Sequence, residues 1–380
     1  MTKQMNSIPV ELAKQVANEV IAPLAVTIDQ ENRFPTEAFQ AFRDTGLLGL
    51  MVPKEYGGLG GELSDLVSVV EVIAESCGST AMCYLMHSVS TYVIAANPTN
   101  EILQSYLRAI ANGKKIGTLA FSETGTGAHF YNPEIKSVHK GNYLLLNGRK
   151  SFVTNGDETN FLIVLTNASK PELGLNMVVV DSQNDGVKFV GAWDGIGLRG
   201  NNSIVCELSN VKVPFTHVIG NEGAGMDLIF NVVAPAFILG SAGVNTGLAR
   251  GAYQTTLDHA KTRKYASGQC LAEIPAIQYY LAEMSCKVDT ASTFIHDAAQ
   301  KADGGEETAM LHVMQSKLLA CENVNLVTNT AMQVCGGKGY SKSLPVERYL
   351  RDSKASSIMA PTVEILKEWI GKTVAGIPLF

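Results

Sequence analysis

Residues 142–166 read NYLLLNGRKSFVTNGDETNFLIVLT, and this stretch decides the fold class because its apolar residues come in short runs divided by turn residues. Such runs, bounded by Gly, Asn and Asp, are typical of β-strands. The same pattern extends over residues 116–215, in GTLAF, EIKSVHK, LNMVVVD, VKFVG, SIVCEL and VKVP. Many strands at such short spacing predict a β-sandwich or β-barrel.

The regions on either side of this block have a helical period. Residues 63–76 (LSDLVSVVEVIAES) and 81–97 (AMCYLMHSVSTYVIAAN) repeat apolar residues at helical spacing. Long helices with short connections indicate a bundle, and four segments of this kind can be drawn at about 224–264, 271–303, 306–334 and 362–375. The sequence therefore predicts an α+β protein with an N-terminal α domain (1–115), a middle β-barrel or β-sandwich domain (116–220) and a C-terminal four-helix bundle (221–380).

The composition is that of a globular protein with a large core. The chain has 380 residues, of which 46% are hydrophobic and 17% charged, whereas disordered chains are poorer in apolar residues and richer in charge. A net charge of −6, without a long run of Lys or Arg, argues against a nucleic-acid partner. No uninterrupted apolar run reaches the ~18–20 residues of a membrane-spanning helix, so we expect no membrane partner.

The cysteines and the N-terminal stretch bear on the compartment. Seven Cys residues, an odd number without a CxxC pair, disfavour a disulfide framework and a zinc site. Residues 1–15 (MTKQMNSIPVELAKQ) lack the apolar core of a signal peptide. We therefore expect a cytoplasmic protein in a reducing compartment, without a metal site.

Two glycine-rich segments are candidates for ligand binding. FSETGTGAH (121–129) follows a predicted strand, and its glycines allow a ligand to approach the backbone, although a plain turn is the alternative. Its spacing matches neither a Walker A loop nor a dinucleotide fingerprint. QVCGGKGY (333–340) follows a long apolar helix, where a glycine C-cap is the simple interpretation. Three glycines in four positions exceed what a cap requires, and indicate a backbone that lies against a phosphate or a flat ring.

His87 is the one histidine that we consider as a catalytic candidate, and a weak one. It lies on an apolar predicted helix, where a buried, hydrogen-bonded histidine is the more common situation. The sequence contains neither the HExxH motif of zinc hydrolases nor the GxSxG motif of serine hydrolases.

Six segments together resemble the acyl-CoA dehydrogenase superfamily of flavoproteins, nearly from end to end of the chain. They are FPTEAFQAFRDTGLLGLMVPKEYGGLGG (34–61), AFSETGTGAH (120–129), NGRKSFVTNGDETNFLIVLT (147–166), LSNVKVPFTHVIGNEGAGM (208–226), GLARGAYQTTLDHAKTRKYASGQCLAEIPAIQYYLAEM (247–284) and MQVCGGKGYSKSLPVERYLRDSK (332–354). The resemblance implies two helical domains that enclose a β domain, with FAD between the β domain and the C-terminal bundle. It also implies a homotetramer or homodimer in which two subunits touch each FAD.

The resemblance implies a set of cofactor-binding residues wherever this sequence matches the family's motifs. Phe121, Ser122 and Gly127 are expected to face the flavin, and Phe152 and Thr154 match an aromatic-x-hydroxyl pair that contacts the isoalloxazine, with Phe in place of the usual Trp. The remaining positions are Thr362, which matches a hydroxyl residue near the FAD, Gln333, Gly336 and Gly337 at the adenosine end of a neighbour's FAD, and Arg263 at the pyrophosphate. Lys264 is the alternative to Arg263 for the pyrophosphate contact, because the spacing between Arg263 and Gly268 is one residue longer than in the family.

The departures from the family pattern fall at the reaction centre. In the family, a glutamate takes the α-proton of an acyl thioester while the β-hydrogen leaves as hydride to the flavin. At that position the segment IMAPT (358–362) places Ala360, so the chain resembles a member that lacks the catalytic glutamate. Some members carry the glutamate early in the first bundle helix instead, but residues 229–243 contain no acid. Ala128 replaces a serine that often binds the thioester, and we expect Ala128 and Met359 beside the substrate.

Three functions remain open at this stage. The first is an FAD-dependent oxidoreductase acting on an acyl thioester, bound to CoA or to an acyl-carrier protein, with an unusual base or a substrate that needs none. The others are a flavin-dependent monooxygenase or oxidase on the same fold, and a non-catalytic flavin- or acyl-binding homologue. Electron-transfer flavoprotein and oxygen are the two candidate acceptors. The backbone N–H of Ala360 is retained, so an oxyanion-type pocket can persist without the base.

Overall fold

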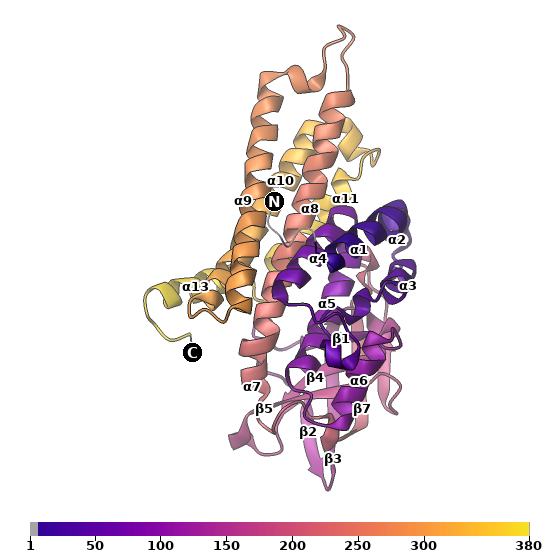
Figure 1. Ribbon diagram of the computed structural model, residues 1–380, viewed down its shortest axis with the longest axis vertical. Helices are drawn as coiled ribbons and strands as arrows, with labels where there is room; N and C mark the ends of the chain where they lie inside the picture. Colours follow the sequence, from indigo (N-terminus) through magenta and orange to yellow (C-terminus); the bar gives the residue numbers. More distant parts are fainter. Residues whose placement is uncertain (1–6, 380) are drawn as a thin grey trace.

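Helices precede and follow a β region along the chain in the computed structural model, which describes residues 7–379. The N-terminal helices cover one side of the strands, and the C-terminal helices extend away from them as a long bundle (Figure 1). The N-terminal helices are α1 (Ile8–Val16), α2 (Ala22–Glu31), α3 (Thr36–Asp44), α4 (Leu63–Ser76), α5 (Gly78–Ala96) and α6 (Glu101–Ala111). This order of elements confirms the predicted fold class.

The strands form two sheets. The three-stranded sheet has the order β1-β4-β5, with β1 parallel to β4, and the four-stranded antiparallel sheet has the order β2-β3-β7-β6. Their bounds are β1 (Gly117–Ala120), β2 (Lys136–Lys140), β3 (Tyr143–Val153), β4 (Phe161–Asn167), β5 (Leu175–Asp181), β6 (Val187–Val190) and β7 (Ile204–Pro214). Side chains from both sheets share one core, so the two sheets pack against each other as a sandwich.

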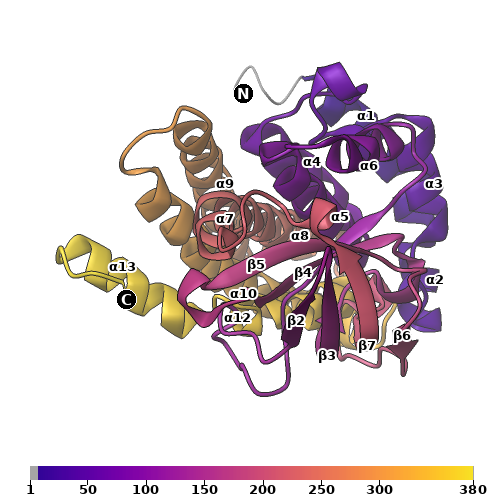
Figure 2. The same cartoon turned by 90° about the horizontal axis from the view of Figure 1, so that it is seen from below.

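Strand β4 is buried on both faces, which makes its sheet the middle layer of the molecule. Leu162 and Val164 point into the core between the two sheets, while Phe161, Ile163 and Leu165 belong to the larger core that is shared with the helices. Because side chains alternate along a strand, one apolar run can serve both cores. Figure 2 shows helices α4, α5 and α8 together on one side of β4 and β5, with the four-stranded sheet on the other side.

The C-terminal helices are long but differ from their predicted bounds by a few residues. They are α7 (Gly225–Leu228), α8 (Ala234–Thr262), α9 (Pro275–Asp303), α10 (Ala309–Tyr340), α11 (Val346–Ser353), α12 (Ala355–Ile358) and α13 (Val363–Val374). Helix α9 begins at Pro275 because proline suits the first helical position, after a 3₁₀ turn at Leu271–Glu273. Helix α10 does not stop at the glycines, since it kinks at Gly336 (φ +54°) and continues to Tyr340.

One helix among residues 7–379 is long and apolar enough to cross a membrane by length and composition alone. It is the continuous helical stretch Gly225–Thr262, and 67% of its most apolar window is buried inside the protein. A core helix passes the same test, and the burial fits that interpretation.

Helix α8 lies against the backbone of α4 without intervening side chains. A Cβ atom added at Gly243, Gly247 or Gly251 would lie 3.1, 2.2 or 2.5 Å from the carbonyl oxygens of Val67, Glu71 and Glu75, respectively. The three glycines and the three carbonyls both recur at intervals of four residues, so the contact repeats once per helical turn. Glycine is required here because any side chain would push the two helices apart.

Charged groups reinforce the same contact between the N-terminal and C-terminal helices. Glu71 on α4 is buried, and its carboxylate accepts hydrogen bonds from Arg250 on α8 (2.8 Å) and from Ser292 (2.9 Å) and His296 (3.1 Å) on α9. Burial opposes the ionisation of Glu71, but the bond from His296 and the charge of Arg250 outweigh it and hold its pKa below the usual value. The two carboxylate oxygens of Asp303, at the end of α9, accept the first N–H groups of α4 at 2.8 and 3.0 Å.

The glycine contact yields a stability prediction. Gly247→Ala is expected to lower the free energy of unfolding by about 2–3 kcal/mol, because its Cβ has no room against the Glu71 carbonyl. Gly371→Ala is the matched control, since this helical glycine of α13 has open space around it and should be neutral or stabilising by up to about 1 kcal/mol. Urea denaturation of the two variants measures both effects, and equal stabilities would contradict the proposed close contact.

Candidate active site

The segment expected to face the flavin is a loop, residues 121–134, between β1 and β2. Phe121 is buried at its start, and the carbonyl oxygen of Ser122 accepts a hydrogen bond from the backbone N–H of Ser151 on β3, at 2.8 Å. Gly127 is exposed with φ of +53°, which glycine adopts without strain, and Ala128 after it is half-buried. The first residues of the loop therefore pack against the end of β3, and Gly127 lies at the surface.

A buried ion pair fixes this loop to the sheet. Lys150 on β3 is fully buried, and its ammonium contacts the carboxylate of Glu123 in the loop. The ammonium also donates to the carbonyl oxygen of Leu165 (2.9 Å), and the second oxygen of Glu123 accepts the backbone N–H of Glu134 (2.6 Å). Burial lowers the pKa of Lys150, and the charge of Glu123 opposes that shift. Both ends of the loop are thereby tied to one buried pair.

Phe152 is turned outward by an irregularity of its strand. The pairing of β3 with β7 shifts register between Lys150 and Val153, and Phe152 between them has φ of +53°. Its side chain is 67% exposed, with the ring of Trp193 edge-on at 6.4 Å between centroids. A positive φ is costly for a bulky residue, by about 1–3 kcal/mol. The result is a flat apolar surface held open on the β domain.

Thr154 lies just behind this surface. Its hydroxyl is buried and hydrogen-bonded to the hydroxyl of Ser203 at 2.8 Å, and its carbonyl oxygen accepts from the hydroxyl of Thr118 on β1 at 2.6 Å. The position is thus coupled to two neighbouring strands. Ser203 had no signal in the sequence, because its contact with Thr154 depends on strand pairing.

The residues expected at the adenosine end lie elsewhere in the chain. Gln333, Gly336 and Gly337 are exposed near the end of α10, and no atom lies within 4 Å of a Cβ added at either glycine. Arg263 caps α8, with its guanidinium 4.5 Å from the ring centre of Tyr265, and Lys264 is exposed beside it. The end of α8 lies at the opposite end of the bundle from the strands (Figure 1). One chain therefore does not bring Arg263 near Phe152.

The end of α8 is basic and contains a buried polar atom that has no hydrogen-bond partner in the described part of the chain. The Nε2 atom of His259 is buried without a hydrogen-bond partner among residues 7–379. Burial lowers the pKa of His259, and the positive charges of Lys338 and Arg263 lower it further. Positive charges converge here on an exposed, glycine-lined backbone, as an anion site requires.

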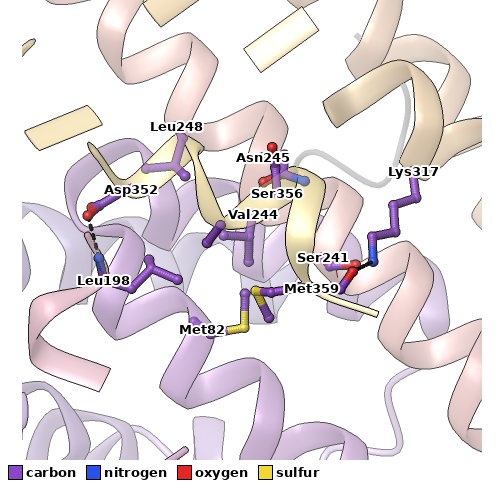
Figure 3. Close-up of a pocket in the computed structure, with 11 residues that line it drawn as sticks. Met82, Leu198, Ser241, Val244, Asn245, Leu248, Lys317, Asp352, Ser356 and Met359 are labelled. Carbon is purple, nitrogen blue, oxygen red and sulfur yellow. Dashed lines mark hydrogen bonds between the residues drawn. The ribbon is translucent and has the colours of Figure 1, made fainter. Parts of the chain in front are cut away.

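Ala360 lies in the short connection between α12 and α13. The carbonyl oxygens on either side of it, those of Met359 and Pro361, accept hydrogen bonds from the ammonium of Lys317 at 3.0 and 3.1 Å. The Ala360–Pro361 peptide bond is cis. No acceptor for the N–H of Ala360 exists within the part of the chain that the structure describes. Figure 3 shows Lys317 reaching this connection from α10.

Lys317 is fully buried, and no motif in the sequence marks it. Burial lowers its pKa to about 8, with a small opposing effect of Cys321. Its ammonium lies 5.4 Å from the ring centre of Phe237 on α8. Its burial follows from its place on the helix. Val313, Lys317, Ala320 and Val324 recur at helical spacing and are all buried, so the lysine lies on the core face of α10.

A cavity of about 10 Å³, room for about one water, lies beside Met359. Figure 3 shows Met82 and Met359 among the side chains that line it. It is lined by Met82, Leu198, Ser241, Val244, Asn245, Leu248, Lys317, Asp352, Ala355, Ser356 and Met359. Asp352 is the carboxylate among them; it accepts the N–H of Leu198 at 2.6 Å, and burial raises its pKa to about 6. Figure 3 shows this carboxylate directed to Leu198, away from Met359.

His87 is a structural residue rather than a catalytic one. It is fully buried, its Nε2 is 2.9 Å from the carbonyl oxygen of Leu48, and its Nδ1 accepts the N–H of Gly117 at 3.1 Å. The neutral ring uses both nitrogens in this way, and burial lowers its pKa to about 4. Thr362 also has a structural contact, because its hydroxyl accepts the N–H of Ile365 at 3.4 Å and caps α13.

Comparison with known proteins identifies the family. Three family models match the chain: the N-terminal domain of acyl-CoA dehydrogenase over residues 8–114, the middle domain over 118–211 and the C-terminal domain over 239–375. The chain belongs to the acyl-CoA dehydrogenase family. It is a flavoprotein oxidoreductase of the acyl-CoA dehydrogenase type, and its cofactor is FAD.

Individual members of the family match over almost their whole length. A probable acyl-CoA dehydrogenase, YngJ, of Bacillus subtilis (strain 168) is 30% identical over 373 residues, which cover 96% of each chain. The acryloyl-CoA reductase (NADH) of Anaerotignum propionicum is 30% identical, over 96% of this chain and 93% of that protein. The structure of butyryl-CoA dehydrogenase from Megasphaera elsdenii superposes with a TM-score of 0.92 at 23% identity, over 99% of both chains.

His87 gives this dehydrogenase fold a defined sensitivity to acid. Its folded-state pKa of about 4 lies below the unfolded value of 6.5, so its contribution to stability is full above pH 6.5 and is lost as pH falls towards 4. The loss should be about 3 kcal/mol. His87→Gln, which does not titrate, should lose correspondingly less stability over this window in urea denaturation at several pH values. Identical pH profiles of the two proteins would contradict the buried neutral histidine.

Proposed function

We propose that this chain is an FAD-dependent oxidoreductase of acyl thioesters that lacks the family's base for the α-proton. The observation that carries the proposal is the connection between α12 and α13, where Ala360 presents a backbone N–H without an acceptor among residues 7–379 and no side-chain oxygen. The carboxylate that lines the neighbouring cavity, Asp352, is engaged by the N–H of Leu198. The proposed division into domains is 1–115, 116–220 and 221–380.

The residues fit FAD in two parts. The exposed ring of Phe152, with Thr154 and the loop of Phe121, Ser122 and Gly127, offers a flat apolar surface bordered by hydroxyl and backbone groups. The basic end of α8, with Arg263 and the buried unpaired nitrogen of His259, suits a pyrophosphate, and Gln333, Gly336, Gly337 and Thr362 complete the proposed set. Because these two parts lie far apart in one chain, we propose a homodimer or homotetramer in which two chains complete each site.

FAD, when bound, supplies a two-electron acceptor for hydride. The chain's own contribution is the N–H of Ala360, which can donate a hydrogen bond to the carbonyl oxygen of a thioester and stabilise negative charge there. Removal of an α-proton needs a base within about 2.6–3.2 Å of it, or one water away. Ala360 has no such group, so ordinary α,β-dehydrogenation is expected to be slow.

The substrate that fits best is one whose oxidation does not depend on this base. Oxidation of a hydroxyl or amino acyl group, on CoA or an acyl-carrier protein, meets that condition. Met82 and Met359 line the neighbouring cavity, and methionine side chains are flexible enough to move aside for an acyl group. Ala128 is proposed at the thioester end. An electron-transfer flavoprotein is the proposed acceptor, with oxygen as the alternative, and the proposed compartment is the cytoplasm.

The first test is cofactor binding. The purified protein should be yellow, with one FAD per chain, and oligomeric. Arg263→Glu should weaken FAD retention by about tenfold or more, because a carboxylate replaces a charge-assisted contact to pyrophosphate. Lys170→Glu, a charge reversal in an exposed turn of the β domain, is the control. If Arg263→Glu retains FAD and Lys264→Glu loses it, the pyrophosphate contact belongs to Lys264.

The second test restores the base. Ala360→Glu, and Ala360→Glu/Pro361→Gly made alongside it, should create or raise flavin reduction by a straight-chain acyl-CoA under anaerobic conditions. Ala360→Gln is the matched control, because it has the same size without a proton-accepting charge. Absorbance of the flavin in a stopped-flow instrument measures the rate. Turnover of butyryl-CoA by the unmutated protein at ~1–10³ s⁻¹ would show that a base exists.

A further inference from the structure

The strongest unexplained feature near the reaction centre is the charge of Lys317. Two lysines among residues 7–379 are completely buried, and they are stabilised differently. Lys150 has the carboxylate of Glu123 as its partner. Lys317 has no carboxylate within 4.0 Å among residues 7–379, and it donates hydrogen bonds to two backbone carbonyls. A buried cation without a counter-ion is costly, so its placement needs a reason.

The geometry of the ammonium group limits what Lys317 can do. Two of its three N–H bonds point at the carbonyls of Met359 and Pro361, at 3.0 and 3.1 Å. The ring of Phe237, 5.4 Å away at its centre, lies against the same ammonium and offers a cation–π contact. The two carbonyls and the ring of Phe237 surround the ammonium group, so Lys317 is poorly placed to take a proton from a substrate.

The two carbonyls belong to the residues directly before and after Ala360. A single side chain that holds both of them fixes the peptide planes of the connection, and with them the direction of the Ala360 N–H. The connection between α12 and α13 has four residues, 359–362. The N–H of Met359 bonds to the carbonyl oxygen of Ala355, and the carbonyl oxygen of Thr362 accepts the N–H of Leu366, so both ends are held by the helices. Ala360 makes no hydrogen bond to residues 7–379, and Lys317 is the side chain that holds the carbonyls on either side of it.

We propose that Lys317 is a positioning residue that clamps residues 359–361 and so aims the N–H of Ala360 at the carbonyl oxygen of the acyl thioester. This inference rests on the proposed function, in which that N–H is the oxyanion donor. No covalent or redox step is assigned to Lys317. Its role is to keep one hydrogen-bond donor preorganised, which is the form in which such donors are effective.

The clamp is also expected to respond to pH. The titratable groups packed around Lys317 are Cys321 on its own helix, whose pKa burial raises, and Asp352 on α11, across the cavity. The groups that α5, α8 and α12 present to the same cavity (Met82, Ser241, Asn245 and Ser356) do not titrate. Loss of the Lys317 charge above about pH 8 should therefore loosen the clamp.

The test uses the FAD-loaded protein and a chromophoric enoyl thioester, cinnamoyl-CoA, whose absorption shifts to the red when its carbonyl is polarised. The unmutated protein should shift this absorption at pH 7. Lys317→Met, which keeps the length of the side chain without its charge, should reduce the shift at least twofold while FAD content is unchanged. Lys317→Arg should restore part of it. Lys367→Met, an exposed lysine of α13 paired with Glu322, is the control and should match the unmutated protein.

A second readout separates the clamp from the proposed function. Hydrogen exchange of the backbone amides in residues 357–362, measured without any thioester, should be at least tenfold faster in Lys317→Met than in Lys367→Met. If the unmutated protein does not shift the probe but exchange still rises in Lys317→Met, the clamp stands and the thioester function fails. If the probe shift and the exchange rate are both unchanged in Lys317→Met, the clamp is wrong.

Should Lys317→Met not fold, a pH titration of the unmutated holoprotein decides the question. The red shift of bound cinnamoyl-CoA should decline at least twofold between pH 7 and pH 9.5. A shift that is constant over this range would overturn the proposal.

Discussion

The close approach of α8 to the backbone of α4 is the contact on which the positions of the other parts depend. Gly247, where a Cβ would lie 2.2 Å from the Glu71 carbonyl, marks the tightest point of that approach. Helix α5 follows α4 after one residue, so fixing α4 also fixes α5. Helix α5 in turn contacts the strands, through the His87 nitrogen that accepts the Gly117 N–H. A shift of α8 relative to α4 would therefore move the β domain relative to the bundle.

Two buried lysines then define the local geometry of the site in different ways. Lys150 with Glu123 forms a closed ion pair that holds the loop of residues 121–134 against β3, at the proposed flavin site. Lys317 binds the backbone carbonyls on either side of Ala360, and in the proposed clamp this contact orients the N–H of Ala360, a residue without a carboxylate. The site is accordingly rich in hydrogen-bond donors and poor in proton acceptors. This combination stabilises negative charge on a bound carbonyl oxygen more readily than it removes a proton from carbon.

Local patterns in the sequence were sufficient for the fold class, and the site residues that they suggest stay predictions. The change from a helical period to short strand-like runs located the β region, and the surplus of glycine at 336–339 marked a real departure, since α10 kinks at Gly336. Contacts between distant segments could not be predicted in the same way. The outward turn of Phe152 comes from a register shift against β7, and the burial of Lys317 comes from packing between α10 and the connection at Ala360. The structural role of His87 likewise depends on Leu48 and Gly117, which no local pattern links to it.

The central claim is that the site lacks a base for the α-proton of an acyl thioester. Hydrogen exchange at the α-carbon tests it directly, because exchange needs only proton removal and return and does not require electron transfer. The FAD-loaded protein would be incubated with butyryl-CoA in D₂O and deuterium uptake at the α-carbon followed by mass spectrometry. The account predicts no uptake above the protein-free control. Uptake at ~1 s⁻¹ or faster would contradict it, because a base would then be within reach of the α-carbon.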